Sequence, residues 1–336
     1  MVYIGSKQRT MKNEIAVVGS TGLVGKEICQ ILSENHIRSG DFLSVSRNMD
    51  DRRNGSVSIE TALRAKPRYI FMVAGNEASK KFTPRFRKYG GTVIDKSSLY
   101  RMEANVPLII PEVNGDILNG NETLVASPNC TTIQLVMALA PIEEIFPMKR
   151  VVVSTYQSVS GSGKKALQQL SSERMGGTVE EFYPYPIDDN LLAQCDDFLP
   201  NGYTKEEEKI VNESRKILRA KDVRITATAV RVPISRCHGI SVNIEFHDEF
   251  DIPNIKRQLA ANPGIVIHDY PQELLYPMPI TARYKDKVFV GRIRRDESCE
   301  NGLHLWIVAD NLRKGAALNA WQIFQTILKV RGDRFF

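Results

Sequence analysis

The feature that most constrains this fold is a short apolar run, residues 14–18, that ends in a glycine-rich turn at residues 19–25. Ile28, Ile31 and Leu32 then recur at helical spacing. This order predicts a strand, a tight turn and a helix. Glycines in such a turn let the backbone approach a pyrophosphate, whose charge the helix N-terminus meets. A tight turn without a ligand is the alternative, because a glycine triplet alone is weakly diagnostic.

The predicted nucleotide site takes in this turn and the end of the next strand. From the turn it comprises Gly19, Ser20, Thr21, Gly22, Leu23, Val24 and Gly25. An acid about 20 residues beyond the turn normally binds the ribose hydroxyls of NAD. This chain has Ser46 and Arg47 there. A hydroxyl and a guanidinium suit a 2′-phosphate, which favours NADP, although Asp50 and Asp51 close by weaken that preference.

Three further apolar runs, at residues 69–73, 92–94 and 124–126, alternate with helix-like stretches. This alternation predicts an α/β fold with a Rossmann-type, doubly wound parallel sheet. After residue 150 the strands, such as 225–232 and 240–246, are longer and alternate in polarity. That change predicts a second, α+β domain whose sheet leaves one face exposed.

Length and composition agree with two domains. The 336 residues, 42% of them hydrophobic, can bury a substantial core. We place a dinucleotide-binding domain at residues 13–129, completed by a C-terminal helix at 312–332, and a second domain at 130–311. The net charge of +6 is small and its basic residues are scattered, which argues against nucleic-acid binding and favours an anionic small molecule.

The cysteines limit the redox and metal chemistry. They are five in number, far apart and without a C-x-x-C pair, so neither a disulfide framework nor a metal site is expected. The sequence shows no signal core and no segment approaching the length of a membrane span. We therefore expect a soluble, cytoplasmic protein that does not associate with membranes.

One cysteine is placed to react. Cys130 lies in Ser-Pro-Asn-Cys-Thr-Thr, residues 127–132, directly before an apolar run at 133–140. A thiol where a strand gives way to a helix faces unpaired amides and a partial positive charge, which favour the thiolate. The same amides could hold an oxyanion formed by attack on a carbonyl. A small apolar residue packed at a helix start is the alternative.

Further motifs, taken in order with the glycine turn and the Cys130 segment, give a specific resemblance. They are residues 106–114, 154–161, 231–238, 290–294 and 310–317. From about residue 13 to residue 332 the chain resembles the aspartate-semialdehyde dehydrogenase family. The resemblance implies an NADP-dependent enzyme that reduces β-aspartyl phosphate to aspartate β-semialdehyde and phosphate through a thioester on Cys130. This reaction lies on the path to lysine, threonine and methionine.

The resemblance also implies an assembly, and it leaves two rivals. Family members have a catalytic and dimerisation domain, so a homodimer or homotetramer is expected. A related N-acyl-amino-acid phosphate reductase is the nearest alternative enzyme. A catalytically silent, nucleotide-binding paralogue is the alternative from another class, but it would have no use for a nucleophile, a base and an anion clamp together.

By motif match, His238 is the expected acid/base residue, Gln157 positions the acyl intermediate, and Arg231 clamps the substrate α-carboxylate. We take Arg231 and His238 to lie seven residues apart on one strand. An odd separation puts side chains on opposite faces of a straight strand. A bulge or a turn near Pro233 and Gly239 must therefore intervene.

The other expected contacts also come from the resemblance. Glu206 would bind the substrate amine and Lys209, one helical turn later, the phosphate. Arg101 would be a second phosphate-binding cation. Asn129 would contact phosphate or an oxyanion, with a turn role after proline as the alternative. Asn311 would contact the nicotinamide side of the cofactor.

The chain departs from the family pattern at several positions. Lys96 replaces the usual asparagine and adds a cation close to the proposed phosphate site. Residues 189–195 replace an expected Asn-x-Ile-Pro-His-like segment, and Tyr284 stands near an expected glycine. These departures remove no catalytic group, but they bear on substrate preference.

Overall fold

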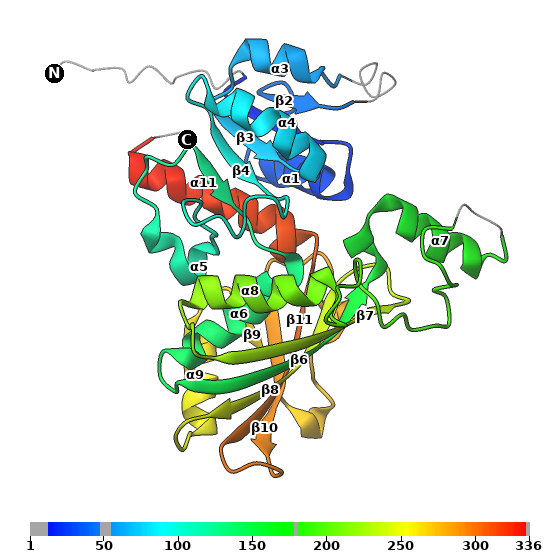
Figure 1. Ribbon diagram of the computed structural model, residues 1–336, viewed down its shortest axis with the longest axis vertical. Helices are drawn as coiled ribbons and strands as arrows, with labels where there is room; N and C mark the ends of the chain where they lie inside the picture. The colour runs from blue at the N-terminus through cyan, green and yellow to red at the C-terminus, as the bar shows by residue number, and fades with distance from the viewer. Residues whose placement is uncertain (1–12, 48–54, 178–180, 334–336) are drawn as a thin grey trace.

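The structure is a computed structural model that describes residues 13–47, 55–177 and 181–333. Within these residues the strands form one five-stranded and one six-stranded sheet, which lie in the upper and lower halves of Figure 1. The predicted combination of a doubly wound parallel sheet with a second, mixed α+β unit is confirmed. No helix of the described residues is long and apolar enough to cross a membrane.

The first sheet is parallel throughout and has the order β2-β1-β3-β4-β5. Its strands are β1 Ile15–Val18, β2 Phe42–Val45, β3 Tyr69–Met72, β4 Thr92–Asp95 and β5 Leu124–Ala126. The helices between them are α1 Leu23–Glu34, α3 Ile59–Ala65 and α4 Asn76–Arg87. Side chains of α3 and α4 pack on one face and those of α1 on the other. Both faces are therefore buried, as the continuous apolar runs predict.

The last helix of the chain returns to the first sheet. A π-helical turn, Arg313–Ala317, leads into α11, Leu318–Arg331, which lies along the sheet in both views. The Phe324 ring packs edge-on against Tyr69 and Phe71 of β3, with ring centroids 5.0 and 5.7 Å apart. The C-terminal segment thus covers the same face of the sheet as α1.

The second sheet is mixed and has the order β7-β6-β8-β11-β10-β9. Its strands are β6 Met148–Ser158, β7 Arg224–Val232, β8 His238–Phe246, β9 Ile265–Ile267, β10 Val288–Asp296 and β11 Gly302–Ala309. Helices α6 Cys130–Glu143, α8 Lys205–Leu218 and α9 Ile252–Ala261 pack together on one face. The other face carries exposed side chains such as Arg150, Tyr156 and Thr228.

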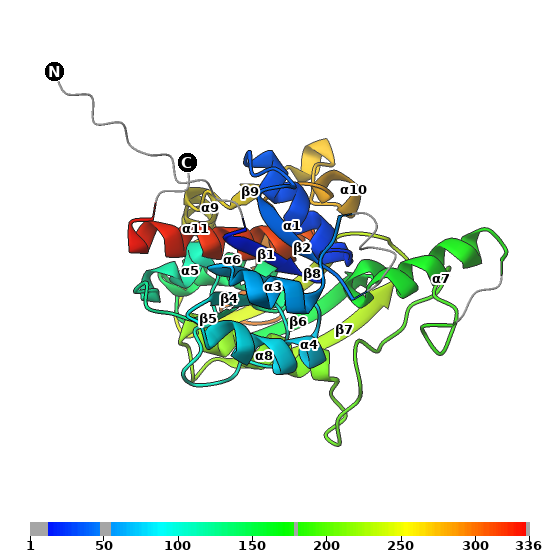
Figure 2. The same cartoon turned by 90° about the horizontal axis from the view of Figure 1, so that it is seen from above.

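Shorter elements complete the second domain and the connections to it. They are α5 Pro111–Asn114, α7 Lys164–Arg174, α10 Pro279–Ala282 and the 3-10 turns Gly115–Ile117, Val159–Ser162 and Pro271–Glu273. In Figure 2, α7 projects to one side of the second sheet. Helix α6 is buried on nearly all sides, because it lies between the second sheet, α8, α9 and the π-helical turn.

The expectation that Arg231 and His238 share one strand is wrong. Strand β7 ends at Val232 and β8 begins at His238, with a turn between them in which Cys237 has a φ of 74°. Strand β6 lies between the two, parallel to β7 and antiparallel to β8. Proline has no N–H to continue a ladder, which explains the end of β7 directly before Pro233. The turn required near that proline is present.

Candidate active site

Cys130 is the first residue of α6, as the sequence predicts. Strand β5 ends at Ala126, and Asn129 caps the helix. The Asn129 side-chain oxygen accepts hydrogen bonds from the amides of Thr131 and Thr132, at 2.8 and 3.3 Å. The turn role of Asn129 is therefore present in the structure. A Cβ on Gly315 of the π-helical turn would lie 3.1 Å from that of Cys130, so this turn packs closely against the cysteine.

His238 faces the thiol. Its Nε2 lies 3.4 Å from Cys130 Sγ, and its Nδ1 accepts a hydrogen bond of 3.0 Å from the amide of Ser158. Because Nδ1 is an acceptor, the neutral ring carries its proton on Nε2, toward the sulfur. Burial, together with the charge of Arg231, lowers the pKa of His238 to about 3, so the ring is neutral near pH 7.

The Cys130 thiol experiences opposing influences. Burial raises its pKa, and the carboxylate of Glu206 adds to that shift. The cations Lys96, Arg231 and Arg101 oppose it, but the pKa stays above its ordinary value. The thiolate therefore becomes favourable when further positive charge or hydrogen-bond donors face the sulfur.

Three predicted residues lie in one row across the second sheet. In the strand register, Gln157 of β6 is opposite Arg231 of β7 on one side and opposite His238 of β8 on the other. All three side chains are buried. A Cβ on Gly161 would lie 3.0 Å from Arg231 Nη1 and 3.3 Å from His238 Nε2. Glycine at this position therefore leaves space between Arg231 and His238.

Glu206 connects this row to α6. Its Oε1 accepts hydrogen bonds from Asn129 Nδ2 at 2.9 Å and from Gln157 Nε2 at 3.0 Å. Gln157 Nε2 also donates to Thr131 Oγ1 at 2.8 Å. Burial raises the pKa of Glu206, but Lys209 and the two amides outweigh it, so the pKa lies below its ordinary value. The site thus contains a buried carboxylate.

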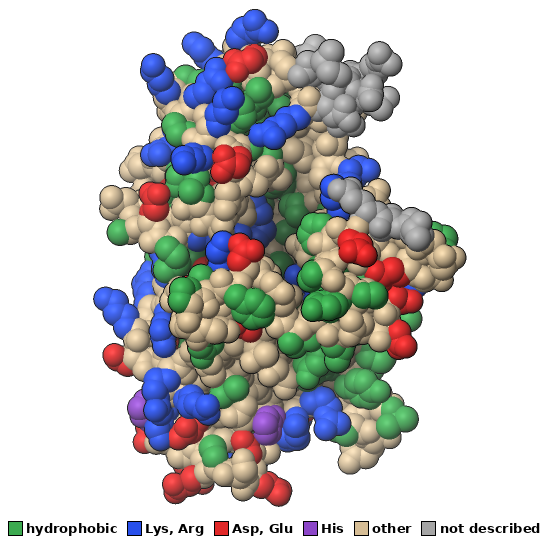
Figure 3. Space-filling model, turned by 45° about the vertical axis from the view of Figure 1, so that its right-hand side comes forward, with side chains coloured by type: hydrophobic (Ala, Val, Ile, Leu, Met, Phe, Trp, Pro, Cys, Tyr) green, Lys and Arg blue, Asp and Glu red, His purple; other side chains and the backbone are tan. Residues whose placement is uncertain are grey.

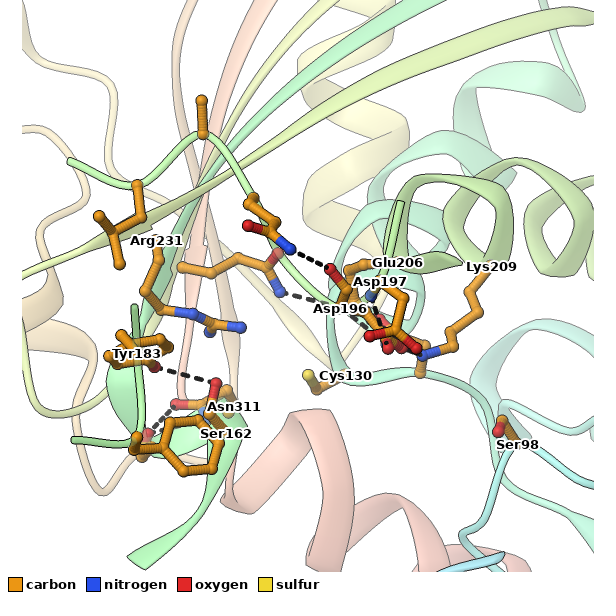
Figure 4. Close-up of a pocket in the computed structure, with 18 of the residues that line it drawn as sticks. Ser98, Cys130, Ser162, Tyr183, Asp196, Asp197, Glu206, Lys209, Arg231 and Asn311 are labelled. Carbon is orange, nitrogen blue, oxygen red and sulfur yellow. Dashed lines mark hydrogen bonds and ion pairs between the residues drawn. The ribbon is translucent and has the colours of Figure 1, made fainter. Parts of the chain in front are cut away.

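The Arg231 guanidinium keeps a hydrogen-bond donor to spare among the described residues. Its Nη1 donates to the Ser158 carbonyl at 2.8 Å. Its buried Nε has no hydrogen-bond partner among the described residues. Nearby, the Tyr183 hydroxyl bonds to Ser162 Oγ at 2.9 Å, as Figure 4 shows. A buried guanidinium with an unused donor is suited to a carboxylate ligand.

Arg101 and Lys209 are instead paired with carboxylates. Arg101 contacts Glu213 at 2.8 Å and also donates to the Lys96 carbonyl at 2.7 Å. Lys209 contacts Asp196 at 2.5 Å and Glu206 at 3.4 Å. Both cations are therefore largely neutralised within the protein.

These groups surround one cavity of about 950 Å³. Figure 3 shows the molecule hollowed between its two halves, with basic side chains near the opening. Of the predicted residues, the cavity is lined by Val24, Arg101, Asn129, Cys130, Gln157, Glu206, Lys209, Arg231 and Asn311. Lys96 and the departing segment around Leu192 line it too.

Asn311 is buried and already used by the protein. Its side-chain oxygen accepts hydrogen bonds from the Cys237 amide at 2.9 Å and from the hydroxyls of Ser158 and Ser160. Its Nδ2 donates to Ser160 Oγ at 3.0 Å. Asn311 thus fixes the turn before His238 while its side chain lines the cavity.

The glycine turn has the geometry of a dinucleotide cradle. Gly19 has a φ of 93°, and a Cβ there would lie 2.9 Å from the Val73 carbonyl. A Cβ on Gly25 would lie only 2.1 Å from the Gly19 carbonyl, so α1 packs closely on the turn. Gly22 caps α1 without a side chain, which leaves the first amides of the helix available to an anion. These residues fit a bound pyrophosphate.

Strand β2 ends beside the glycine turn, since Gly19 N donates to the Val45 carbonyl at 3.0 Å. Ser46 is buried there and Arg47 is exposed. Asp50 and Asp51, which weaken the NADP preference, lie outside the described residues. No group of three or more His, Cys, Asp or Glu among the described residues is placed to hold a metal ion.

Sequence reasoning missed several contributors. The Ser158 amide orients His238, but any residue could supply an amide, so the sequence carries no signal for it. Glu213 follows Lys209 by four residues on α8, and this helical spacing could have indicated that it faces the cavity. Tyr183 and Asp196 come from irregular segments, where periodicity gives no information.

Comparison with known proteins identifies the family of this chain. Residues 14–120 match the family model "Semialdehyde dehydrogenase, NAD binding domain", and residues 139–314 match "Semialdehyde dehydrogenase, dimerisation domain". Aspartate-semialdehyde dehydrogenase of Bacillus subtilis is 40% identical over 94% of this chain and 97% of that protein. The Aquifex aeolicus enzyme is 38% identical, covering 95% of this chain and 99% of its own length.

A solved structure extends the likeness to three dimensions. Aspartate semialdehyde dehydrogenase II from Vibrio cholerae superimposes with a TM-score of 0.86 and is 33% identical, covering 95% of this chain and 99% of the other. The similarity therefore covers nearly the whole chain. This chain therefore belongs to the aspartate-semialdehyde dehydrogenase family.

Proposed function

We propose that this chain reduces β-aspartyl phosphate to aspartate β-semialdehyde and phosphate, with NADPH as the reductant and Cys130 as the nucleophile. The observation that carries the proposal is Cys130 Sγ at the start of α6, 3.4 Å from His238 Nε2, in a cavity lined by cationic side chains. A thiol beside an imidazole at a helix N-terminus is suited to acyl transfer.

The first half of the reaction is acyl transfer. The Cys130 thiolate attacks the carbonyl carbon of the acyl phosphate, a C–S bond forms, and phosphate leaves with the electrons of the broken C–O bond. Nε2–H of His238 faces the sulfur and stabilises its negative charge. We assign the acid/base role to this atom, through which the proton lost by the Cys130 thiol passes to the departing phosphate. Of the first amides of α6, those of Thr131 and Thr132 already donate to Asn129, which leaves the Cys130 amide to hold the oxyanion.

The second half is reduction of the thioester. NADPH supplies the hydride when it is bound. The carbon attached to Cys130 then carries an alkoxide, and its collapse releases the semialdehyde and returns the thiolate. His238 stabilises that thiolate as it departs, with the donor that faces Cys130 in the structure. Gln157, fixed between Thr131 and Glu206, would orient the acyl group.

The substrate contacts are those that the family resemblance implies, and the charges in the cavity support them. Arg231, with an unused buried donor, would bind the α-carboxylate. The buried carboxylate of Glu206 would bind the α-ammonium group. Arg101 and Lys209 would contact the phosphate, with Asn129 beside them at the helix start.

The experiment that tests this function is the initial rate of NADP reduction by aspartate β-semialdehyde, with and without phosphate. We expect a fast rate that requires phosphate. A folded protein that binds NADP but shows no rate would contradict the proposal and favour another acyl phosphate or a silent paralogue.

The cofactor would lie on the glycine turn, residues 19–25, with its 2′-phosphate near Ser46 and Arg47 and its nicotinamide side near Asn311. Arg47→Ala should therefore weaken NADPH binding by about 10-fold or more, the loss of one charge-assisted hydrogen bond. It should weaken NADH binding far less. Fluorescence titration with both cofactors measures this, and equal losses would contradict a phosphate contact at Arg47.

We also propose that the chain forms a homodimer. Support comes from the match of residues 139–314 to a family dimerisation domain and from the uncovered face of the second sheet. Sedimentation velocity distinguishes monomer, dimer and tetramer. A monomer at micromolar concentration would contradict the proposal.

A further inference from the structure

The cations that line the cavity differ in whether a carboxylate pairs with them. Among the described residues they are Lys96, Arg101, Lys209 and Arg231. Arg101 is paired with Glu213, and Lys209 is paired with Asp196 and Glu206. A carboxylate at hydrogen-bond distance offsets most of the attraction that a cation exerts on an incoming anion. Arg101 and Lys209 therefore attract a phosphate less than their number suggests.

Lys96 has no such partner. It follows β4 directly, and its ammonium donates to the carbonyl of Pro128, two residues before Cys130. Among the described residues Lys96 forms no ion pair within 4.0 Å, and the carboxylates of Glu213 and Glu206 act on it only from farther away. Burial, reinforced by the charge of Arg101, lowers the pKa of Lys96 to about 7. A partly desolvated cation beside another cation is costly, and a bound anion would relieve that cost.

The two unpaired cations lie in different parts of the cavity. Arg231 belongs to the second sheet, and Lys96 belongs to the loop after β4 in the first domain. Figure 4 shows Arg231 on one side of Cys130 and Ser98, two residues after Lys96, on the other. A substrate with a negative group at each end and its reacting carbon at the sulfur would match this arrangement. The α-carboxylate would take the Arg231 side, which leaves the phosphate for the Lys96 side.

We propose that Lys96 is a phosphate-binding residue of this enzyme, and that its ammonium binds the phosphate group beside the N-terminus of α6. The inference rests on the proposed function and adds a residue to it. The ammonium offsets the charge that develops on the phosphate oxygen as the C–O bond breaks, and the proton that the phosphate gains is the one lost by the Cys130 thiol. In the opposite direction it holds phosphate next to the thioester. An ammonium binds a phosphate as a point charge, which the family's usual amide cannot do.

The test compares Lys96→Asn, which restores the usual family residue, with Lys96→Arg and with Lys80→Asn. Lys80 is an exposed lysine of α4 and controls for the change in net charge. In the assay with aspartate β-semialdehyde, Lys96→Asn should raise the KM for phosphate about 10- to 100-fold, the loss of one hydrogen bond to a charged group. The KM for NADP should stay unchanged, Lys96→Arg should recover part of the loss, and Lys80→Asn should match the wild type.

A binding measurement separates this inference from the proposed function. Phosphate binding is followed by ³¹P NMR line broadening, which needs no turnover. If the wild type does not turn over the semialdehyde, the proposed function fails, yet weaker phosphate binding by Lys96→Asn still supports Lys96. An unchanged phosphate affinity in folded Lys96→Asn would overturn the inference. A parallel rise in every KM would overturn it too, because it would indicate a structural role.

A third measurement uses only the wild type and does not depend on any variant folding. Acetic anhydride modifies neutral lysines, and mass spectrometry follows Lys96 and Lys80 in the same sample. Saturating inorganic phosphate should slow modification of Lys96 at least several-fold and leave Lys80 unchanged. Equal rates at Lys96 with and without phosphate would contradict the inference.

Discussion

The two sides of Cys130 are built by different means. On one side Gln157, Arg231 and His238 lie in a single row of the second sheet, so strand hydrogen bonds set their spacing. On the other side Arg101 and Lys209 are held by ion pairs with the carboxylates of Glu213 and Asp196. Backbone ladders resist the loss of any one side chain, whereas an ion pair fails when either partner is removed. The side with Gln157, Arg231 and His238, called the sheet side, should therefore tolerate substitution of neighbouring residues better than the side with Arg101 and Lys209, called the cation side.

The largest effect on turnover should come from removing the sulfur of Cys130, which lies between the two sides. Cys130→Ala removes the proposed nucleophile and should lower turnover by at least about 10³-fold, because the remaining groups cannot form a thioester. NADPH binding should stay intact, since Cys130 is not part of the glycine turn. Stopped-flow and fluorescence titration measure the two properties. Turnover at the normal rate would exclude covalent catalysis at this residue.

Substitution of Glu213 should disrupt the ion pairing on the cation side. This residue pairs with Arg101, and both side chains are almost completely buried, with 2% and 7% of their surface exposed. Its other oxygen accepts a hydrogen bond of 2.7 Å from the Asn129 amide. Glu213→Ala leaves a buried guanidinium without a carboxylate and should lower the free energy of unfolding by about 3 kcal/mol.

Urea denaturation measures this loss. The matched control is Glu60→Ala, which breaks an ion pair of the same length, 2.8 Å, between exposed side chains of Glu60 and Arg85. It should change stability little, because solvent screens exposed pairs. Equal losses in the two variants would mean that the Arg101 pair does not hold the cation side in place.

The sheet side can be probed by filling its open space. Gly161→Ala places a methyl group 3.0 Å from Arg231 Nη1 and 3.3 Å from His238 Nε2. We expect kcat/KM to fall about 10-fold with little change in stability, because displacing the clamp costs transition-state binding of about 1.4 kcal/mol. Gly40→Ala, where a Cβ would meet nothing within 4 Å, is the control. Unchanged kcat/KM in Gly161→Ala would show that the substrate does not use this space.

The last prediction concerns how anion binding near Lys96 depends on pH. Lys96, with a pKa of about 7, is charged below that pH and neutral above it. The charged groups that act on it are Arg101, Cys130, Glu213 and Glu206. Sulfate, which stays a dianion throughout, should compete with phosphate about 10-fold less well at pH 8 than at pH 6.

The control for this pH dependence is Lys96→Asn, in which sulfate inhibition should be nearly independent of pH over the same range. Inhibition constants at five or six pH values suffice. If Lys96→Asn keeps the wild-type slope, another group, such as the Cys130 thiol, sets the dependence.

The sequence predicted the parts of this molecule that local patterns specify. The apolar runs at residues 69–73 and 92–94 are strands β3 and β4, and Cys130 begins a helix. The runs at residues 225–232 and 240–246 are strands β7 and β8, but placing Arg231 and His238 on one strand overlooked the turn of five residues between these strands. Periodicity also could not predict that Glu213 meets Arg101, since 112 residues separate them along the chain.

The return of α11 to the first sheet has a consequence for biosynthesis. Tyr69 and Phe71 of β3 pack against Phe324, so the part of this face that α11 covers stays open until that helix leaves the ribosome. At about 5–20 residues per second, synthesis of the whole second domain in between takes on the order of 10 s or more. During that time the nascent first domain exposes a patch that attracts chaperones and other unfinished chains. The same helix begins next to the turn that packs on Cys130, so a truncated chain would lack both a covered sheet and a closed site around the thiol.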